Sequence, residues 1–434
     1  MRVYLKALGC RLNEAELENW AEDFRGRGHT ISNNCREADL IVLNTCAVTH
    51  EAVKKSRQLI RQSRRTNPLS KLVVTGCSAT LDPALQQKIS AIDLLVANHE
   101  KDSLVDIVSR KLALEATPNN AADPGATPLF QRGRNRAFIK IQDGCRYRCS
   151  FCIVTVARGG ERSSTPVRII EQINRLHAHG VKEVVLTGVH VGGYGSDLGY
   201  NLYGLLKTIL METGIARIRL ASVEPWDLHE NFFELFESGR LMPHMHLPLQ
   251  SGNDEILKRM ARRCNTVTYR QLVSRARSLL PDFNVTTDII VGFPGETDQH
   301  WDQGLAFIRE MGFSHIHIFP YSRRDGTAAA VMPGQIDHET RRERCRQLHQ
   351  VAVELKQAYL ERQVGRQFPV LLENCGLERG TGARTWCGYT TNYVRVMLPR
   401  AHDDDRHWNE IVPVKITGLT PERDALTAQA AAPE

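Results

Sequence analysis

The strongest constraint on the fold is a repeated alternation between short apolar strands and polar stretches of helix length. In the first 115 residues the strands read "RVYLKAL", "DLIVLN", "KLVVTG" and "DLLVAN". Strands that alternate with helices form parallel sheets, because each crossover helix covers one face of the sheet. We therefore expect an open parallel sheet domain in residues 1–115. A linker rich in Pro, Ala, Asn and Gly follows at 116–135.

The same alternation returns over a longer course in residues 136–333. Its strands read "AFIKIQD", "EVVLTGV", "RIRLASV", "HMHLPLQ", "TTDIIVG" and "HIHIFPY". Six such units in series predict a partial (β/α)6 barrel whose functional edge lies at the carboxyl ends of its strands. We expect a connecting helix at 334–364 and a small β-barrel at 365–425, which makes the chain an α/β protein with three folded domains.

Composition limits the class of protein. Of the 434 residues, 42% are hydrophobic and 24% charged, which is ordinary for a globular protein. No apolar run approaches the length of a membrane span. Lys6 stands where an export signal would have its apolar region, so we expect a cytoplasmic protein with no membrane partner. The net charge of +7 permits a polyanionic partner, and eleven cysteines in a reducing compartment argue against a disulfide framework.

Three cysteines stand within eight residues, directly after the strand "AFIKIQD": Cys145, Cys149 and Cys152. Thiolates are ligands suited to iron–sulfur clusters and to zinc. Zinc sites favour paired C-x2-C modules, and no matching pair occurs downstream. We therefore favour a 4Fe–4S cluster with one iron left open for a substrate. A zinc knuckle with a distant fourth ligand, or three buried cysteines that are close only in sequence, are the alternatives.

A second set of cysteines follows three strands of the N-terminal segment, with Cys10 after the first, Cys46 after the second and Cys77 after the third. The carboxyl ends of parallel strands meet at one edge of a sheet, so three thiols can converge there although they are far apart in sequence. Helix N-termini at the same edge favour the thiolate form. The alternative is that each is a buried, inert thiol.

The C-x3-C-x2-C loop resembles the signature of the radical S-adenosylmethionine enzymes, and the second triplet narrows the resemblance to their methylthiotransferases. Six segments are most similar to the branch that modifies N6-threonylcarbamoyladenosine in tRNA: "LGCRLN", "NTCAVTHEAVKKSRQLIR", "QDGCRYRCSFC", "ARGGERS", "LTGVHVGGYG" and "HLPLQSGNDEILKRM". Thr155 and Val156 stand where that family usually has proline and an aromatic residue, and Cys264 where it often has tyrosine. We expect these departures to alter packing near the loop more than ligation.

This resemblance implies a mechanism with two 4Fe–4S clusters and two molecules of S-adenosylmethionine. One molecule methylates a sulfur at the N-terminal cluster. The other yields a radical that removes hydrogen from carbon-2 of the adenine just 3′ of the anticodon. The resemblance also implies cofactor contacts at the cysteine loop and at the ends of the second to fifth barrel strands. The matching residues are Phe151, Thr187, Gly188, Ser222, Glu224, Gln250, Gly292, Pro294, Gly295 and Glu296. Taken singly, glycines and polar residues at strand ends are as often simple turns.

Two segments are candidates for contact with tRNA. The run "KKSRQLIRQSRR" contains no acid and offers Lys54, Lys55, Arg57, Arg61, Arg64 and Arg65. The tail "FPVLLENCGLERGTGARTWCGYTTNYVRVMLP" resembles the small RNA-binding TRAM barrel. Its candidates for base stacking and phosphate contact are Arg384, Tyr389, Tyr393 and Arg395. A solvated helix face and aromatic residues that merely fill a small barrel are the alternatives.

The leading hypothesis is therefore a tRNA methylthiotransferase that acts on N6-threonylcarbamoyladenosine. The resemblance implies three partners, namely a tRNA anticodon stem-loop, an electron donor of the flavodoxin or ferredoxin type, and a sulfur source. We expect a monomer. The same chemistry on isopentenyladenosine, and a cluster-bearing RNA-binding or electron-transfer protein without catalysis, are the alternatives.

Overall fold

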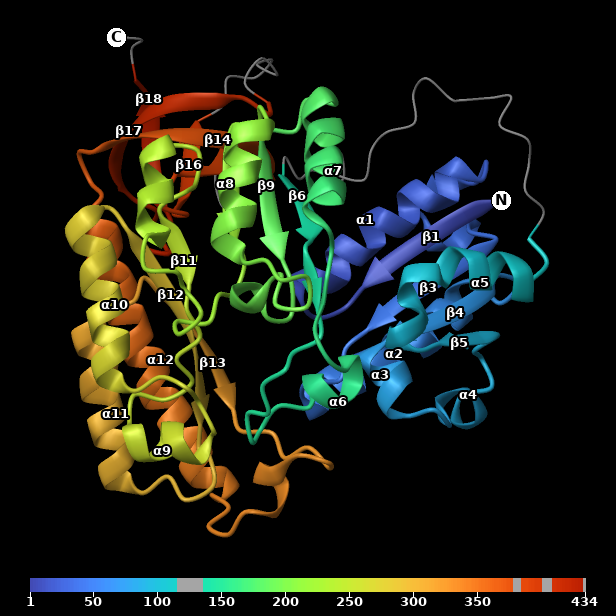
Figure 1. Cartoon of the computed structure of the whole chain (residues 1–434), viewed down its shortest axis with the longest axis horizontal. Coiled ribbons are helices and arrows are strands. Elements are labelled where there is room, and N and C mark those ends of the chain that lie inside the picture. The colour runs from blue at the N-terminus through green and yellow to red at the C-terminus, as the bar shows by residue number, and fades with distance from the viewer. Residues whose placement is uncertain (115–135, 378–383, 400–407, 432–434) are drawn as a thin grey trace.

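The structure is a computed structural model that describes residues 1–114, 136–377, 384–399 and 408–431. The expected linker at 116–135 lies outside the described residues. Figure 1 shows three parts: an N-terminal sheet domain, a central barrel, and a small β-barrel near the C-terminus. Within the described ranges no helix is both long and apolar enough to cross a membrane.

The N-terminal domain is a five-stranded parallel sheet in the order β2-β1-β3-β4-β5. Trp20 and Phe24 pack with α5, the last helix of this domain, on one face of the sheet. Leu59 and Ile60 of α2 cover the other face. The four expected strands are present, and the structure adds β2, a three-residue edge strand too short to show a pattern. The elements are β1 (Arg2–Ala7), α1 (Arg11–Gly26), β2 (Thr30–Ser32), η1 (Cys35–Glu37), β3 (Leu40–Thr45), α2 (His50–Thr66), β4 (Lys71–Gly76), α3 (Cys77–Leu81), α4 (Leu85–Lys88), β5 (Leu94–Val96), η2 (Asn98–Ser103) and α5 (Leu104–Lys111).

The central domain is a partial barrel of parallel strands in the order β6-β9-β10-β11-β12-β13. Isolated parallel bridges, such as Ser222 with His246, join its two three-stranded halves. These six strands are the ones that the alternation predicts. The elements are β6 (Arg136–Lys140), β7 (Gln142–Asp143), α6 (Val154–Arg158), β8 (Arg162–Ser163), α7 (Pro166–Ala178), β9 (Glu183–Thr187), η4 (Val191–Gly193), α8 (Leu202–Glu212), β10 (Arg217–Leu220), η5 (Phe232–Ser238), β11 (His244–His246), α9 (Asp254–Arg259), α10 (Thr266–Leu279), β12 (Asn284–Val291), α11 (Asp298–Met311), β13 (His315–Pro320), η6 (Ala328–Val331) and α12 (His338–Glu361).

The C-terminal domain is a closed barrel in the order β14-β15-β16-β18-β17. Its strands are β14 (Gln367–Leu377), β15 (Arg384–Tyr389), β16 (Arg395–Pro399), β17 (Ile411–Leu419) and β18 (Leu426–Ala430). The sequence pattern predicts β14, β16 and β17. It misses β18, "LTAQA", because alanine has a low strand preference and only tertiary pairing recruits the segment. One cysteine of this domain, Cys387, is disulfide-bonded, which the sequence reading did not anticipate.

The strands of the central barrel begin with polar residues, and these residues dock the C-terminal barrel. Figure 1 shows that barrel over the starting ends of the central strands, opposite the loop that carries α6. Arg217, the first residue of β10, donates to the backbone oxygens of Pro369 and Tyr389 at 2.7 and 3.1 Å. Asn284, the first residue of β12, donates to the backbone oxygen of Asn392 at 2.7 Å. The small domain is therefore fixed to the barrel by directed hydrogen bonds.

One buried carboxylate, that of Glu183, lies close to three arginines at this junction of the two barrels. Glu183 has no exposed surface, and its oxygens lie 2.9 Å from Arg219 Nε, 3.7 Å from Arg136 Nε and 3.8 Å from Arg217 Nη1. Burial alone would raise the pKa of Glu183, but the three guanidinium groups hold it below its usual value. The carboxylate is therefore charged in the folded protein and offsets three buried cations.

Replacement of Glu183 by alanine should destabilise the junction of the two barrels. We expect a loss of about 3–5 kcal/mol, because a buried cation cluster would lose its carboxylate. Thermal unfolding of the full chain and protease cleavage near residue 365 would measure the change. Glu237→Ala, at an exposed site, is the control. Equal melting temperatures for the two variants would contradict the assignment.

Candidate functional site

The structure brings the thiols of the N-terminal triplet together at the carboxyl edge of the sheet. Cys10 caps α1 after β1, Cys46 follows β3, and Cys77 opens α3 after β4. Burial, then the neighbouring thiols Cys77 and Cys10, raise the pKa of Cys46 to about 11. Cys46 and Cys77 are buried, whereas Cys10 is exposed at the edge of a cavity. Three sulfur ligands thus face one small space.

Two glycines permit this close approach. Gly9 has a φ of +99°, and a Cβ built on it would lie 2.8 Å from Cys46 Sγ. Gly76 has a φ of +103°, and its Cβ would lie 2.2 Å from the backbone oxygen of Thr45. Side chains other than glycine are strained in this region of φ, and here they would also collide with neighbours. Both positions therefore require glycine for the cysteines to lie this close together.

The second triplet lies in the loop after β6. Burial, then Glu224, Cys152 and Cys149, raise the pKa of Cys145 to about 12, so the three thiols are also neighbours. The Arg262 guanidinium lies 3.8 Å from Cys149 Sγ and stacks on an indole ring at 4.4 Å.

Cys264, which departs from the family pattern, also lies near this triplet. Burial raises the pKa of its thiol, and Cys149 adds to the rise. Thr155 and Val156, the other departures, are in α6, where Val156 is exposed.

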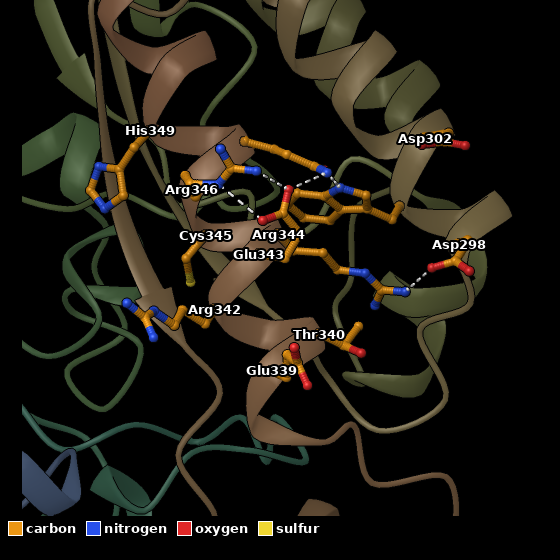
Figure 2. Close-up of a pocket in the computed structure, with 12 residues that line it drawn as sticks. Asp298, Asp302, Glu339, Thr340, Arg342, Glu343, Arg344, Cys345, Arg346 and His349 are labelled. Carbon is orange, nitrogen blue, oxygen red and sulfur yellow. Dashed lines mark hydrogen bonds and ion pairs between the residues drawn. The ribbon is translucent and has the colours of Figure 1, made fainter.

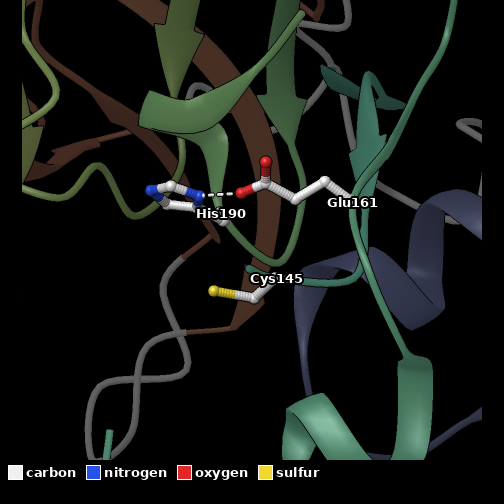
Figure 3. A group of neighbouring side chains, drawn as sticks. All are labelled: Cys145, Glu161 and His190. Carbon is white, nitrogen blue, oxygen red and sulfur yellow. Dashed lines mark hydrogen bonds and ion pairs between the residues drawn. The ribbon is translucent and has the colours of Figure 1, made fainter. Parts of the chain in front are cut away.

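An acidic cluster surrounds a histidine beside Cys145. Figure 3 shows Cys145, Glu161 and His190 facing one another. His190 Nδ1 is 2.5 Å from Glu161 Oε1, and its Nε2 is 2.6 Å from Asp227 Oδ2 and 3.6 Å from Glu224 Oε2. Burial lowers the pKa of His190, but these carboxylates outweigh it and raise the pKa above its usual value. The sequence predicted only Glu224 among these residues and missed Glu161, His190 and Asp227, although the segments "ARGGERS" and "LTGVH" contain Glu161 and His190.

A buried ionic network joins the N-terminal domain to the barrel. Arg158 Nη1 donates to Glu16 Oε1 and to Asp143 Oδ1, both at 2.9 Å. Lys101 Nζ donates to Glu16 Oε2 at 2.6 Å, and Lys140 Nζ lies 3.0 Å from Asp143 Oδ2. Burial alone would raise the pKa values of Glu16 and Asp143, but these cations hold both below their usual range. Both carboxylates are therefore charged.

The same network reaches the N-terminal thiols. Arg158 Nη2 donates to Asn13 Oδ1 at 2.7 Å, and that oxygen is 3.7 Å from Cys10 Sγ. Asn98 Nδ2 donates to a backbone oxygen of α6 at 2.7 Å and lies 3.7 Å from Cys77 Sγ. The segment that follows one triplet thus packs directly against the other.

Two adjoining cavities lie between the triplets. The larger, of about 580 Å³, fills the inside of the barrel and has Cys10 in its wall. The smaller, of about 180 Å³, has Cys152 in its wall. Asp288 and Phe319 line both cavities. The two cavities therefore adjoin at these two residues, and each has one thiol of a different triplet in its wall.

Polar side chains from neighbouring strands line the larger cavity. His246 Nε2 is 3.1 Å from Asp288 Oδ1, and its Nδ1 is 2.9 Å from Thr286 Oγ1. Burial, then His317 and nearby Lys356, lower the pKa of His315 to about 4, so this imidazole is neutral at physiological pH. The signal in the sequence was the alternation "HMH" and "HIH", which places both histidines of a strand on one face.

The expected cofactor residues fall into three groups. Phe151 and Gln250 line the smaller cavity and Ser222 the larger. Thr187 is buried at the end of β9, where the side chain of Gln142 accepts from the amides of residues 189 and 190. Four of the remaining expected residues form the turn after β12: Gly292, Pro294, Gly295 and Glu296.

That turn packs against α12 instead of either cavity. The amide of Gly292 donates to Glu296 Oε2 at 2.9 Å, and Arg344 Nη1 donates to the same oxygen at 2.9 Å. Gly188 follows Thr187 at the end of β9, and a Cβ built on it would be 3.0 Å from the Gln142 backbone oxygen. Contact of the turn with a cofactor stays a prediction.

The expected RNA-binding residues also divide. On α2, Lys54, Lys55, Arg57, Arg61 and Arg65 are exposed. Arg64 instead donates to the backbone oxygens of residues 70 and 91 and pairs with Asp93, so it holds the sheet domain together.

In the C-terminal barrel, Arg395 is exposed, whereas Tyr389 and Tyr393 are half-buried and line the larger cavity. Their rings stack on each other at 4.8 Å, and the Arg136 guanidinium lies 4.5 Å from Tyr389. The side chain of Arg384 lies outside the described residues.

A hollow of about 1070 Å³, larger than either cavity, is a surface groove along α11 and α12 (Figure 2). Its charged side chains pair with one another: Arg344 with Asp298 and Arg346 with Glu343, each at 2.7 Å. It contains no residue of either triplet, so size alone does not mark the functional site.

The chain is similar to known proteins over nearly its whole length. Residues 139–308 match the family described as the Radical SAM superfamily, and residues 2–97 match the one described as Uncharacterized protein family UPF0004. A relative named threonylcarbamoyladenosine tRNA methylthiotransferase MtaB, from Bacillus subtilis, is 34% identical over 95% of this chain and 93% of its own. Its namesake from Thermotoga maritima is 36% identical over 86% of each chain.

Another relative has a different named substrate. The tRNA-2-methylthio-N(6)-dimethylallyladenosine synthase of Geobacillus kaustophilus is 34% identical over 90% of this chain and 75% of its own. Among solved structures, the radical S-adenosylmethionine methyltransferase TsrM from Kitasatospora setae shares the fold. The TM-score is 0.57 at 14% identity, over 76% of this chain and 75% of that one.

Replacement of Arg158 by methionine should loosen the N-terminal domain from the barrel. Two buried carboxylates would lose a shared partner, which we expect to cost about 3 kcal/mol. Hydrogen exchange of the α1 amides would report the loss. The matched control is Arg162→Met, because this guanidinium also faces Asp143, at 3.5 Å, but is about 44% exposed. An exposed pair contributes under about 1 kcal/mol, so comparable effects of the two changes would contradict the assignment.

Proposed function

The chain belongs to the radical S-adenosylmethionine tRNA methylthiotransferases, and from that membership we propose that it methylthiolates carbon-2 of N6-threonylcarbamoyladenosine, the adenosine 3′ of the anticodon. The reaction would use two 4Fe–4S clusters and two molecules of S-adenosylmethionine. The observation that carries this proposal is a pair of adjoining cavities beside two separate sets of three thiols, with Cys10 in the wall of one cavity and Cys152 in the wall of the other.

The donor chemistry of both triplets fits such clusters. Each triplet gathers three sulfur ligands, and neighbouring thiols raise the pKa values within each set, as expected for thiols that share one desolvated space. Thiolates are the ligands that iron–sulfur clusters take from proteins, and three of them leave one iron open. Cys10, Cys46 and Cys77 would hold one cluster. Cys145, Cys149 and Cys152 would hold the other.

Bound clusters with S-adenosylmethionine would supply the radical chemistry and the methylthio group, which side-chain acids and bases cannot provide. The chain supplies position and charge. The carboxylates of Glu161, Glu224 and Asp227 beside Cys145 suit the ammonium and sulfonium charges of the cofactor. Phe151 and Gln250, in the smaller cavity, suit the adenine of the cofactor.

The chemistry of the larger cavity supports the choice of nucleoside. The Bacillus subtilis and Geobacillus kaustophilus relatives are both 34% identical to this chain, so percent identity does not separate the two named substrates, although the match covers 93% of the first relative and 75% of the second. The cavity wall includes Arg11, Lys356 and Arg395, together with four histidines. Such a wall suits the polar, anionic threonylcarbamoyl group. An isopentenyl group is apolar and offers no acceptor to the cations of this wall.

We propose that the exposed basic residues of α2 contact the phosphates of the anticodon stem. Arg395 of the C-terminal barrel would extend that contact. A flavodoxin or ferredoxin type of electron donor, a sulfur source and a cytoplasmic location complete the proposal.

Iron content tests the two-cluster arrangement. Anaerobically prepared protein should contain about eight irons per chain, and the variant with Cys10, Cys46 and Cys77 all changed to alanine about four. Cys35→Ala, a cysteine of the same domain outside both triplets, is the control and should keep the full content. About four irons in the unaltered protein would remove the second cluster from the proposal.

Nucleoside analysis tests the substrate. Mass spectrometry of tRNA from cells with and without the gene should show loss of the methylthio group from threonylcarbamoyladenosine alone. Loss from isopentenyladenosine would overturn the choice. Retention of both methylthio groups would overturn the activity itself.

A further inference from the structure

One lysine in the wall of the larger cavity has a charge with no partner. Lys356 of α12 is half-buried beside His315, on the side of the barrel that α12 covers. Among the described residues no carboxylate lies within 4.0 Å of its amine, and it makes no hydrogen bond there. An ammonium group that lines a cavity and has no paired carboxylate is available to an anionic ligand.

The other cations of the cavity are less available. Arg219 is committed to Glu183 at 2.9 Å and to two backbone oxygens of the C-terminal barrel at 2.8 Å. Arg11 pairs with Glu14 at 3.0 Å. Arg395 is as unpaired as Lys356 among the described residues, but it is exposed. Among the described residues of the wall, Lys356 is therefore the one half-buried cation without a paired carboxylate.

The acceptors around Lys356 cannot neutralise it. Asp288, the carboxylate of the inner wall, is taken by His246 at 3.1 Å. Asp424, at the outer side, accepts from Thr420 at 3.1 Å and is exposed. His315 beside the amine is neutral at physiological pH, because burial and its cationic surroundings lower its pKa to about 4. A ligand carboxylate would thus meet one ammonium and one neutral imidazole.

The shape of the modified base places its carboxylate away from the reacting carbon. In adenine, carbon-2 and the carbon that bears N6 flank the same ring nitrogen, so an N6 substituent extends toward a different wall from carbon-2. Cys10, from the N-terminal domain, and Lys356, from α12, lie in different walls of the same cavity.

We propose that Lys356, assisted by His315, forms a subsite that binds the free carboxylate of the threonylcarbamoyl group. The inference rests on the proposed function and deepens it, because it assigns discrimination between anionic and neutral N6 substituents to one ammonium group. Lys356 acts on substrate binding and orientation and takes no part in bond making.

The test compares three anticodon stem-loops that differ only at the adenosine 3′ of the anticodon. One carries threonylcarbamoyladenosine, the second its methyl ester, and the third unmodified adenosine. Fluorescence anisotropy with the anaerobically purified full chain gives each Kd. The unaltered protein should bind the free acid about tenfold tighter than the ester, as for one hydrogen-bonded ion pair in a partly buried site. In Lys356→Met this ratio should fall to about one, and in Lys356→Arg most of it should remain.

Controls separate this subsite from a general contact with RNA. Lys207→Met removes an exposed lysine of α8 and should leave the ratio unchanged. Lys356→Gln is a second neutral variant in case the methionine variant unfolds on heating. A phosphate contact would weaken all three stem-loops equally, and this result would overturn the proposal. An unaltered acid-to-ester ratio in both neutral variants would do the same.

Failure of this inference and failure of the proposed function give different results. If the chain acts on isopentenyladenosine, nucleoside analysis shows it directly and the unaltered protein does not prefer the acid over unmodified adenosine. If only the subsite is wrong, the unaltered protein still prefers the acid and forms its methylthio product, but the Lys356 variants do so equally well.

Discussion

The architecture depends on one buried contact, in which the Arg158 guanidinium lies between Glu16 of the N-terminal domain and Asp143 of the barrel. Charges removed from water are tolerated only when each has well-placed partners. Lys101 and Lys140 complete those partners, so the two domains have one favourable docking. That docking brings the two sets of thiols to adjoining cavities. A generic parallel sheet and a generic barrel are joined into one unit through this contact.

The opposite end of the barrel shows a second use of buried charge. Glu183 offsets three guanidinium groups, two of which also bind backbone oxygens of the C-terminal barrel. The stacked Tyr389 and Tyr393 lie in this junction and line the cavity. The small barrel therefore forms part of the wall of the larger cavity. Tyr389 and Tyr393 face the interior of the central barrel and not only an outer surface that could contact RNA. The directed hydrogen bonds between the two barrels hold these rings there.

Several features could be predicted because they follow from local pattern. The six barrel strands and the places of Cys10, Cys46 and Cys77 follow from strand alternation, since parallel strands end at one edge. Arg158 could not be assigned, because Glu16 is 142 residues away in the chain. Arg64 reads as part of a basic helix face, yet its guanidinium holds backbone oxygens of the sheet domain. Such roles depend on partners that the pattern does not reveal.

The sequence by itself determined the family, the class of fold and the two cysteine triplets, because periodicity and cysteine spacing are properties of short segments. Tertiary structure alone decided which strand faces share a cavity and which charges remain without partners in its wall. Histidines on β11 and β13 and Lys356 on α12 are separated by up to 112 residues, and only barrel closure brings them together. The arrangement of histidines and charges in the larger cavity therefore depends on packing, whereas the cysteine triplets can be read directly from the sequence.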